Sequence, residues 1–135
     1  MARNVIIVGG GRVGRHAAEQ LSEDRNNVTI VELDHDKCEQ VSPKVHNVVQ
    51  GDGTMPEVLD EANLVDADVV AALTNDTEVN LTVCELAHEE NDDIRTILRI
   101  ATDGERDHGH RHFVDDITYP AAAGAKLAAE QISSE

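Results

Sequence analysis

The chain has 135 residues, of which 40% are apolar, so it can bury a core, yet no apolar run approaches the roughly 20 residues that cross a bilayer. Its 27 acidic and 11 basic residues give a formal charge of −16, which disfavours nucleic acid and anionic membranes as partners. Acidity with so few lysines resembles proteins of salt-loving organisms. Neither a signal peptide nor a Cys-x-x-Cys pair is visible, so we expect a cytoplasmic protein whose two cysteines are reduced thiols on helices.

Short β-branched runs alternate with longer helical stretches along the chain. The runs lie at 4–8, 28–33, 46–49, 68–73 and 95–100, with a weaker one at 117–118. The helical stretches between and after them lie at 12–22, 55–62, 77–89 and 121–132. Continuous apolar runs are typical of strands buried on both faces. We therefore predict one α/β domain over 1–135, a Rossmann-like doubly wound parallel sheet of order 3-2-1-4-5-6 with helices on both faces.

Two helix starts carry a capping-box spacing. Thr54 is followed three residues later by Glu57, and Asn75 is followed in the same way by Glu78. In such a box the first side chain and the acid satisfy free backbone N–H groups. We expect these pairs to begin the second and third helices of the pattern.

The sequence Gly-Gly-Gly-Arg-Val-Gly at residues 9–14 matches Gly-x-Gly-x-x-Gly between the first strand and the first helix. Gly9 would permit the tight turn, Gly11 would let the backbone approach a pyrophosphate, and Gly14 would let the helix pack near the strand. Glu32 ends the second strand 18 positions after Gly14, where an acid that binds ribose hydroxyls is expected. The pattern predicts a dinucleotide site, and the acid favours NAD over NADP.

Arg12 lies inside the glycine motif, at the positive end of the helix dipole. A solvent-exposed arginine is disfavoured there, so a contact with ligand phosphates is the more plausible role.

With these residues the chain resembles the nucleotide-binding domain of Trk/Ktr-type potassium-uptake regulators, called TrkA-N, KTN or the RCK N-lobe. The resemblance covers nearly the whole chain. It rests on four segments, which are the glycine motif, Val-Glu-Leu-Asp at 31–34, Gly-Asp-Gly-Thr at 51–54 and Thr-Asn-Asp-Thr-Glu-Val-Asn at 74–80, together with Leu98-Arg99. Generic dehydrogenases share only the first two segments.

The resemblance implies site residues beyond the glycine motif. Asp52 should lie near the adenosine, Thr74 near the phosphates, and Arg99 on the phosphate side or at a neighbouring subunit. The full expected cofactor-binding set is Gly9, Gly11, Arg12, Val13, Gly14, Glu32, Leu33, Asp34, Asp52, Gly53, Thr74, Asn75, Asp76 and Arg99. We expect no catalytic residue and no metal ligand.

The resemblance also implies a function: a cytoplasmic regulatory subunit or domain that binds NAD(H) and gates a membrane potassium transporter or channel through a ligand-dependent conformational change. ATP, ADP or AMP is the alternative ligand. The implied partners are the transporter subunit and further copies of the chain, with no nucleic acid and no direct membrane insertion. A small NAD-dependent oxidoreductase is a further alternative. It is disfavoured because no Tyr-x-x-x-Lys pair appears and no residues remain for a substrate domain.

Three features remain outside this assignment. His108, His110 and His112 alternate, and we interpret them as a polar surface segment rather than a metal site. Many full-length family members carry a second lobe after this domain. The alanine-rich stripe of Ala121, Ala125, Ala128 and Ile132 fits a cap on this domain and a subunit contact equally well.

Overall fold

The computed structural model describes residues 2–102 and 111–134. The strands in this part of the chain are β1 (Asn4–Val8), β2 (Asn27–Glu32), β3 (Asn47–Gln50), β4 (Val69–Ala72), β5 (Arg95–Arg99) and β6 (Asp116–Thr118). The helices are α1 (Arg12–Glu23), α2 (His35–Val41), α3 (Pro56–Glu61), α4 (Thr77–Glu90) and α5 (Pro120–Ser133), with 3-10 turns η1 (Ser42–Lys44) and η2 (Leu64–Asp66).

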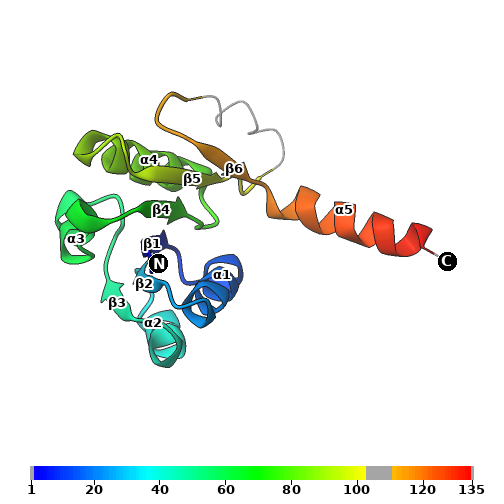
Figure 1. The fold of residues 1–135 in the computed structure, drawn as a ribbon, viewed down its shortest axis with the longest axis horizontal. Coiled ribbons are helices and arrows are strands. Elements are labelled where there is room, and N and C mark those ends of the chain that lie inside the picture. Colours follow the sequence, from blue (N-terminus) through cyan, green and yellow to red (C-terminus); the bar gives the residue numbers. More distant parts are fainter. Residues whose placement is uncertain (1, 103–110, 135) are drawn as a thin grey trace.

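Within the described residues the strands form one six-stranded parallel sheet of order β3-β2-β1-β4-β5-β6 (Figure 1). This is the predicted strand order, and the Rossmann-like fold is confirmed. Strands β2 and β3 lie on one side of β1, and β4 to β6 lie on the other. Because β1 and β4 are parallel, the loops after both strands lie at the same edge, and these loops lead to helices on opposite faces of the sheet. Such a switch point is where ligands bind in doubly wound sheets.

The sheet separates two apolar layers. Helices α1 and α2 cover one face, where Ile7, Ile30 and Val41 are fully buried, and α3 and α4 cover the other, where Leu59 and Leu98 are fully buried (Figure 1). Along each strand successive side chains enter opposite layers, which explains why the strands read as continuous apolar runs. Cys38 and Cys84 are buried free thiols on α2 and α4, as predicted.

The helix starts differ from the sequence expectation. Thr54 does not cap α3: its N–H and its hydroxyl both donate to Asp52 Oδ1, at 2.9 and 2.7 Å, and α3 begins at Pro56 without a side-chain cap. Helix α4 is capped by Asp76, whose Oδ1 accepts from the N–H groups of Glu78 and Val79, and not by Asn75. In both loops an aspartate accepts the local N–H groups, which is the competing geometry of an Asx turn.

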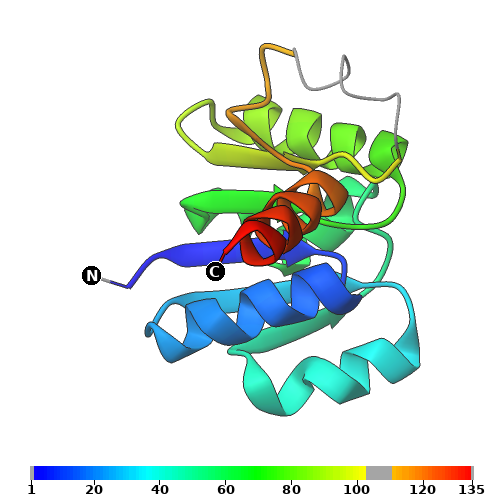
Figure 2. The ribbon, with the colours of Figure 1, turned by 90° about the vertical axis from the view of Figure 1, so that its right-hand side faces the viewer.

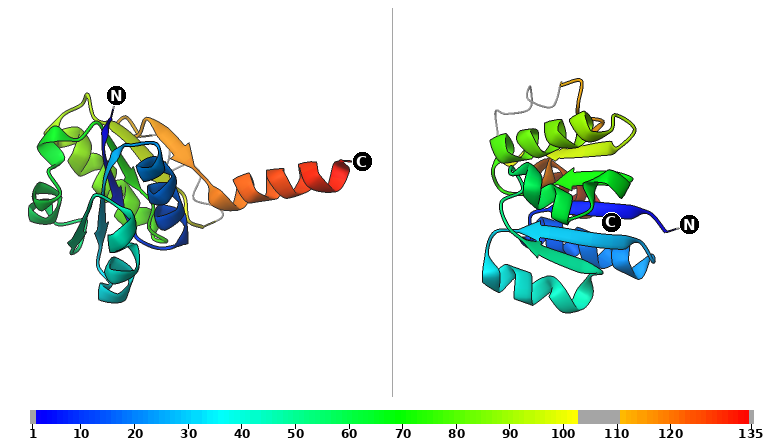
Figure 3. Two further views of the ribbon diagram at one scale, coloured as in Figure 1. Left: turned by 60° about the horizontal axis from the view of Figure 1, so that its bottom comes forward. Right: turned by 90° about the vertical axis from the view of Figure 1, so that its left-hand side faces the viewer.

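Helix α5 projects away from the rest of the molecule (Figures 1 and 3). Seen from its free end, it stands over the face of the sheet that carries α1, with its C-terminus directed outward (Figure 2). None of its residues is buried, and Leu127 and Ile132 are 55% and 83% exposed. The interpretation of α5 as a cap on its own domain is therefore wrong for the described structure.

Candidate functional site

A cleft of about 870 Å³ lies at the carboxyl ends of the strands, above the switch point between β1 and β4. Its walls come from the glycine turn, the end of β2 with α2, the loop after β3, the loop after β4 and the end of β5. The sequence-predicted residues that line it are Gly9, Gly11, Arg12, Val13, Glu32, Leu33, Asp52, Gly53, Thr74, Asn75, Asp76 and Arg99.

The glycine turn has the geometry that its sequence predicts. Gly9 adopts a φ of +113°, which a residue with a side chain rarely does. A Cβ on Gly14 would lie 1.9 Å from the carbonyl oxygen of Gly9, so only glycine lets α1 pack this close to the turn. A Cβ on Gly11, in contrast, would meet no atom within 4 Å. The first glycine sets the turn, the last sets the packing, and the middle one faces open space.

The N-terminus of α1 opens into this cleft. Gly11 is its N-cap, no side chain caps it, and no acidic residue lies in its first turn. The first N–H groups of a helix have no intrahelical acceptor, and the helix dipole makes this end positive. The end of α1 is therefore prepared for an anion, in contrast to α2 and α4, which Asp34 and Asp76 cap.

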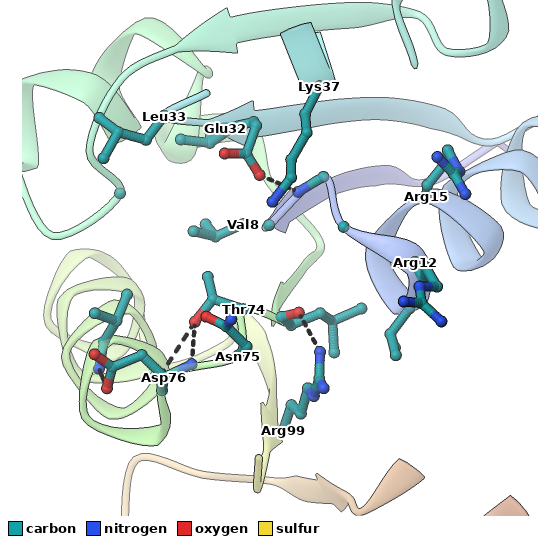
Figure 4. Close-up of a pocket in the computed structure, with 18 of the residues that line it drawn as sticks. Val8, Arg12, Arg15, Glu32, Leu33, Lys37, Thr74, Asn75, Asp76 and Arg99 are labelled. Atoms are coloured by element: carbon teal, nitrogen blue, oxygen red, sulfur yellow. Dashed lines mark hydrogen bonds between the residues drawn. The ribbon is translucent and has the colours of Figure 1, made fainter. Parts of the chain in front are cut away.

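Glu32 lies directly beside the glycine turn (Figure 4). Its Oε1 accepts from the Gly10 N–H at 2.7 Å and its Oε2 accepts from the Asp34 N–H at 2.8 Å. Each carboxylate oxygen can accept more than one hydrogen bond, so capacity for ligand hydroxyls remains. Glu32 thus fixes the turn as well as facing the cleft.

The wall after β4 is organised by Asn80, a fully buried residue of α4. Its Oδ1 accepts from the N–H and the hydroxyl of Thr74, and its Nδ2 donates to the carbonyl oxygens of Thr74 and Arg99. Asn80 therefore joins the ends of β4 and β5. Asn80 ends the segment 74–80 on which the family resemblance rests, but it was not among the predicted site residues. It holds Thr74 in place and does not itself line the cleft.

Arg99 reaches from the end of β5 across to β4 (Figure 4). Its Nη1 donates to the Leu73 carbonyl oxygen at 3.2 Å, while its buried Nε has no hydrogen-bond partner in the described structure. Burial lowers the pKa of Arg99 from its usual value. Among the described residues no acidic side chain forms a salt bridge with Arg99. A partly buried cation of this kind would be stabilised by a bound anion.

Four cations converge on the cleft in an otherwise acidic chain. They are Arg12, Arg15, Lys37 and Arg99, which are four of the 11 basic residues, whereas Glu32, Asp52 and Asp76 are three of the 27 acidic ones. The lining therefore has a formal charge of +4 − 3 = +1 against −16 for the chain. Figure 4 shows Arg12 and Arg15 on the α1 side and Arg99 below them. This concentration of positive charge favours an anionic ligand.

Sequence reasoning missed several lining residues. Gly10, Arg15, Lys37, Gln40 and Gly51 line the cleft without being predicted. Arg15 lies three residues after Arg12 and therefore on the same face of α1, so the spacing of the two arginines could have predicted its place in the cleft. Lys37 and Gln40 lie on α2, a helix of seven residues that is too short to show a helical period in the sequence.

Two predicted residues do not line the cleft. Gly14 is buried beneath the turn, where it serves the packing role expected of it. Asp34 caps α2, because its Oδ1 accepts from the N–H groups of Asp36 and Lys37.

Other candidate chemistry is limited. Among the described residues no group of three or more His, Cys, Asp or Glu side chains is placed to hold a metal. His112 stacks edge-on with His88 and Phe113, whereas His108 and His110 lie outside the described residues. Desolvation raises the pKa of Cys84 to about 12, which makes it a poor nucleophile. No helix in the described ranges is long and apolar enough to span a membrane.

The sequence is similar to one domain family and to potassium uptake proteins of two organisms. Residues 5–120 match the model of the TrkA-N domain family. The chain is 38% identical over 103 residues to a Trk system potassium uptake protein TrkA homolog of Pyrococcus abyssi, covering 76% of this chain and 45% of that protein. It is 39% identical over 85 residues to Trk system potassium uptake protein TrkA of Halomonas elongata, covering 62% and 19%. The chain thus spans less than half the length of either relative.

Solved structures share the fold. The TrkA-N domain of the inner membrane protein ybaL from Escherichia coli superposes with a TM-score of 0.87 at 19% identity, covering 98% of both chains. GsuK bound to ADP gives a TM-score of 0.81 at 23% identity, covering 97% of this chain and 34% of GsuK. The GsuK channel bound to NAD gives 0.68 at 16% identity, covering 87% and 21%. The strand order, the glycine turn and the family match agree, and the chain belongs to the TrkA-N domain family.

Proposed function

We propose that this chain is the nucleotide-sensing domain of a regulator of potassium uptake, and that it binds NAD(H) in the cleft at the glycine turn. The observation that carries the proposal is the cleft itself: an uncapped helix end and four cations on an otherwise acidic chain. These groups fit the phosphates of a nucleotide. The potassium-uptake role rests on the names of the TrkA relatives.

Each part of the ligand has a group that would hold it. The N–H groups at the start of α1 and the side chains of Arg12 and Arg99 would bind the phosphates, with Val13 behind them. Glu32 would accept hydrogen bonds from ribose hydroxyls, beside Leu33. Asp52 and Gly53 would lie near the adenosine, and Thr74, Asn75 and Asp76 would complete the phosphate side.

An adenine mononucleotide is the second candidate, and one observation favours it. Three guanidinium groups, those of Arg12, Arg15 and Arg99, line the cleft, which is more positive charge than the two charges of an NAD pyrophosphate require. GsuK has been solved with ADP and with NAD, so this fold accepts both ligand types. We assign no reaction to the cleft, and a small NAD-dependent oxidoreductase is the least favoured of the three candidate functions.

The proposed mechanism is regulatory. Ligands act by binding two conformations with different affinity, and the change in packing between domains would gate a membrane potassium transporter. The partners in this proposal are the transporter subunit on the cytoplasmic side and further copies of the chain. The exposed apolar side chains of α5 are available for such contacts.

Ligand identity is tested by thermal unfolding in concentrated KCl with NAD⁺, NADH, ATP, ADP or AMP. A ligand at 100 times its Kd adds about 2.7 kcal/mol of stability, which is a readily measured shift. NAD⁺ or NADH should give the largest shift, and Glu32→Ala should reduce it. Glu89→Ala is the matched control, because it removes an exposed acid of α4 that lies outside the cleft. A shift with ATP or ADP alone would replace NAD(H) by the mononucleotide, and no shift with any of the five would refute the proposal.

A further inference from the structure

The side chain of Gln50 makes two contacts that join the end of β3 to the segment after β2, on the Glu32 side of the cleft. Leu33 follows β2, and the glycine-rich loop at 51–53 follows β3. Gln50, the last residue of β3, donates from Nε2 to the Leu33 carbonyl oxygen at 3.5 Å, and its Oε1 lies 3.1 Å from His35 Nδ1 at the start of α2. We call this arrangement the His35–Gln50 latch. It holds α2, which carries Lys37 and Gln40 into the cleft, against the end of β3.

The latch requires a doubly protonated imidazole ring. His35 Nδ1 faces the amide oxygen of Gln50, and His35 Nε2 lies 3.0 Å from Glu39 Oε1. Both oxygens are acceptors, so both ring nitrogens must carry hydrogen. A neutral ring has a single N–H and must give up one of the two contacts.

The surroundings of His35 favour this charge. Glu39 and Asp36 face it from its own helix, and Asp34 precedes it; β3 contributes only the neutral Gln50, and the loop after β3 carries Asp52. The hydrogen bond to Gln50, followed by the charge of Glu39, raises the pKa of His35 above 6.5. The same two contacts that form the latch therefore favour the charged form of His35.

We infer that protonation of His35 closes the latch and thereby strengthens nucleotide binding in the cleft. The inference rests on the proposed function and adds a pH-dependent control to it. Because the pKa in the folded protein is raised, the latch is fully formed below the unfolded value and is lost as pH rises through the folded value. By reciprocity, a bound nucleotide should raise the pKa of His35 further.

The test is the Kd of NAD⁺ measured by calorimetry from about pH 5.5 to about pH 8.5. NAD⁺ is the probe because its pyrophosphate keeps its charge over this range, unlike the terminal phosphates of ADP. Wild-type affinity should fall roughly twofold to fivefold as pH rises, since the contact is solvent-exposed and contacts of this kind are weak. His35→Gln should remove this pH dependence. His46→Gln, a change of an exposed histidine at the amino-terminal end of β3, should leave it intact.

A second readout is independent of binding strength. The ring resonances of His35, followed by NMR across the same pH range, should titrate at higher pH in the presence of NAD⁺ and at lower pH in Gln50→Met, which lacks the amide oxygen. The inference is overturned if NAD⁺ binds with the same pH dependence in wild type and His35→Gln, or if NAD⁺ leaves the His35 titration unchanged. If NAD⁺ binds at no pH, ADP takes its place, with His35→Gln correcting for titration of its phosphate. Failure of both ligands would refute the proposed function instead.

Discussion

Helices α1 and α5 have similar lengths, 12 and 14 residues, but opposite surroundings. The apolar face of α1 packs on the sheet through Ala18 and the partly buried Val13, Ala17 and Leu21. Helix α5 is much less amphipathic than α1, and none of its residues is buried. An alanine-rich helix of this length is only marginally stable alone in water, so packing against another surface would stabilise α5.

The contrast shows what the α/β body does for the site. Because α1 is packed against β1 and β2, its N-terminal N–H groups are held at the switch point, ready for an anion. Helix α5 follows the three-residue β6, and none of its residues is buried against the α/β body. The following predictions compare changes in the body with matched changes outside it.

The largest expected effect comes from glycine substitutions in the two helices. Gly14→Ala would place Cβ 1.9 Å from the Gly9 carbonyl oxygen and should cost more than about 4 kcal/mol of unfolding free energy. Gly124→Ala in α5 meets no atom within 4 Å and should add up to about 1 kcal/mol of helix stability. Urea unfolding followed by circular dichroism measures both. Equal stability of the two variants would show that α1 does not pack on the turn as described.

Leucine truncations sharpen the same contrast. Leu59, on the inner face of α3, is fully buried, whereas Leu127 of α5 is 55% exposed. Leu59→Ala should cost about 2–5 kcal/mol because it leaves a cavity, and Leu127→Ala should stay within about 0.5 kcal/mol of wild type at low protein concentration. A large loss for Leu127→Ala that grows with protein concentration would instead identify α5 as an interface.

A third change tests the support beneath the cleft. Asn80→Ala removes the acceptor of the Thr74 N–H and should cost about 1–3 kcal/mol, because that partly buried N–H loses its partner. Hydrogen exchange at Thr74 should accelerate. Asn91→Ala, which removes only an exposed contact to the Asp93 N–H, is the control. Unchanged exchange at Thr74 in Asn80→Ala would contradict the role given to Asn80.

The smallest effect concerns cations. Arg99→Met should weaken binding of the preferred nucleotide by about tenfold, near the low end of the roughly 1.5–3 kcal/mol that a charged hydrogen bond contributes, because three other cations remain in the cleft. Arg3→Met, which removes a cation before β1 at the far end of the sheet, should not change the affinity. Calorimetric titration distinguishes them. An equal loss in both variants would mean that overall charge, rather than the cleft, determines affinity.

The sequence predicted the strand order and the glycine turn because both depend on local patterns. Apolar runs of four to six residues and a Gly-x-Gly-x-x-Gly motif are visible without tertiary information. The sequence left open whether α5 caps its own domain or meets another subunit, because an apolar stripe does not specify what packs on it.

The differences from the sequence expectation lie at aspartates in loops. Asp34, a predicted ligand contact, caps α2 and does not line the cleft, and Asp52 accepts the N–H of Thr54, which does not cap α3. Whether an aspartate binds a ligand or its own backbone depends on loop geometry, which spacing does not encode. Lys37 and Gln40 were missed for the related reason that α2 is too short to show a period.

The most direct test of the central claim is a steric block in the cleft. Gly11→Leu adds a side chain where a Cβ meets no atom within 4 Å, so the protein should remain folded while the approach to the α1 N-terminus is filled. Calorimetric titration with NAD⁺ and with ADP should show binding to wild type and none to Gly11→Leu, with matching circular dichroism spectra. Unchanged binding to Gly11→Leu would place the nucleotide elsewhere and contradict the account given of this cleft.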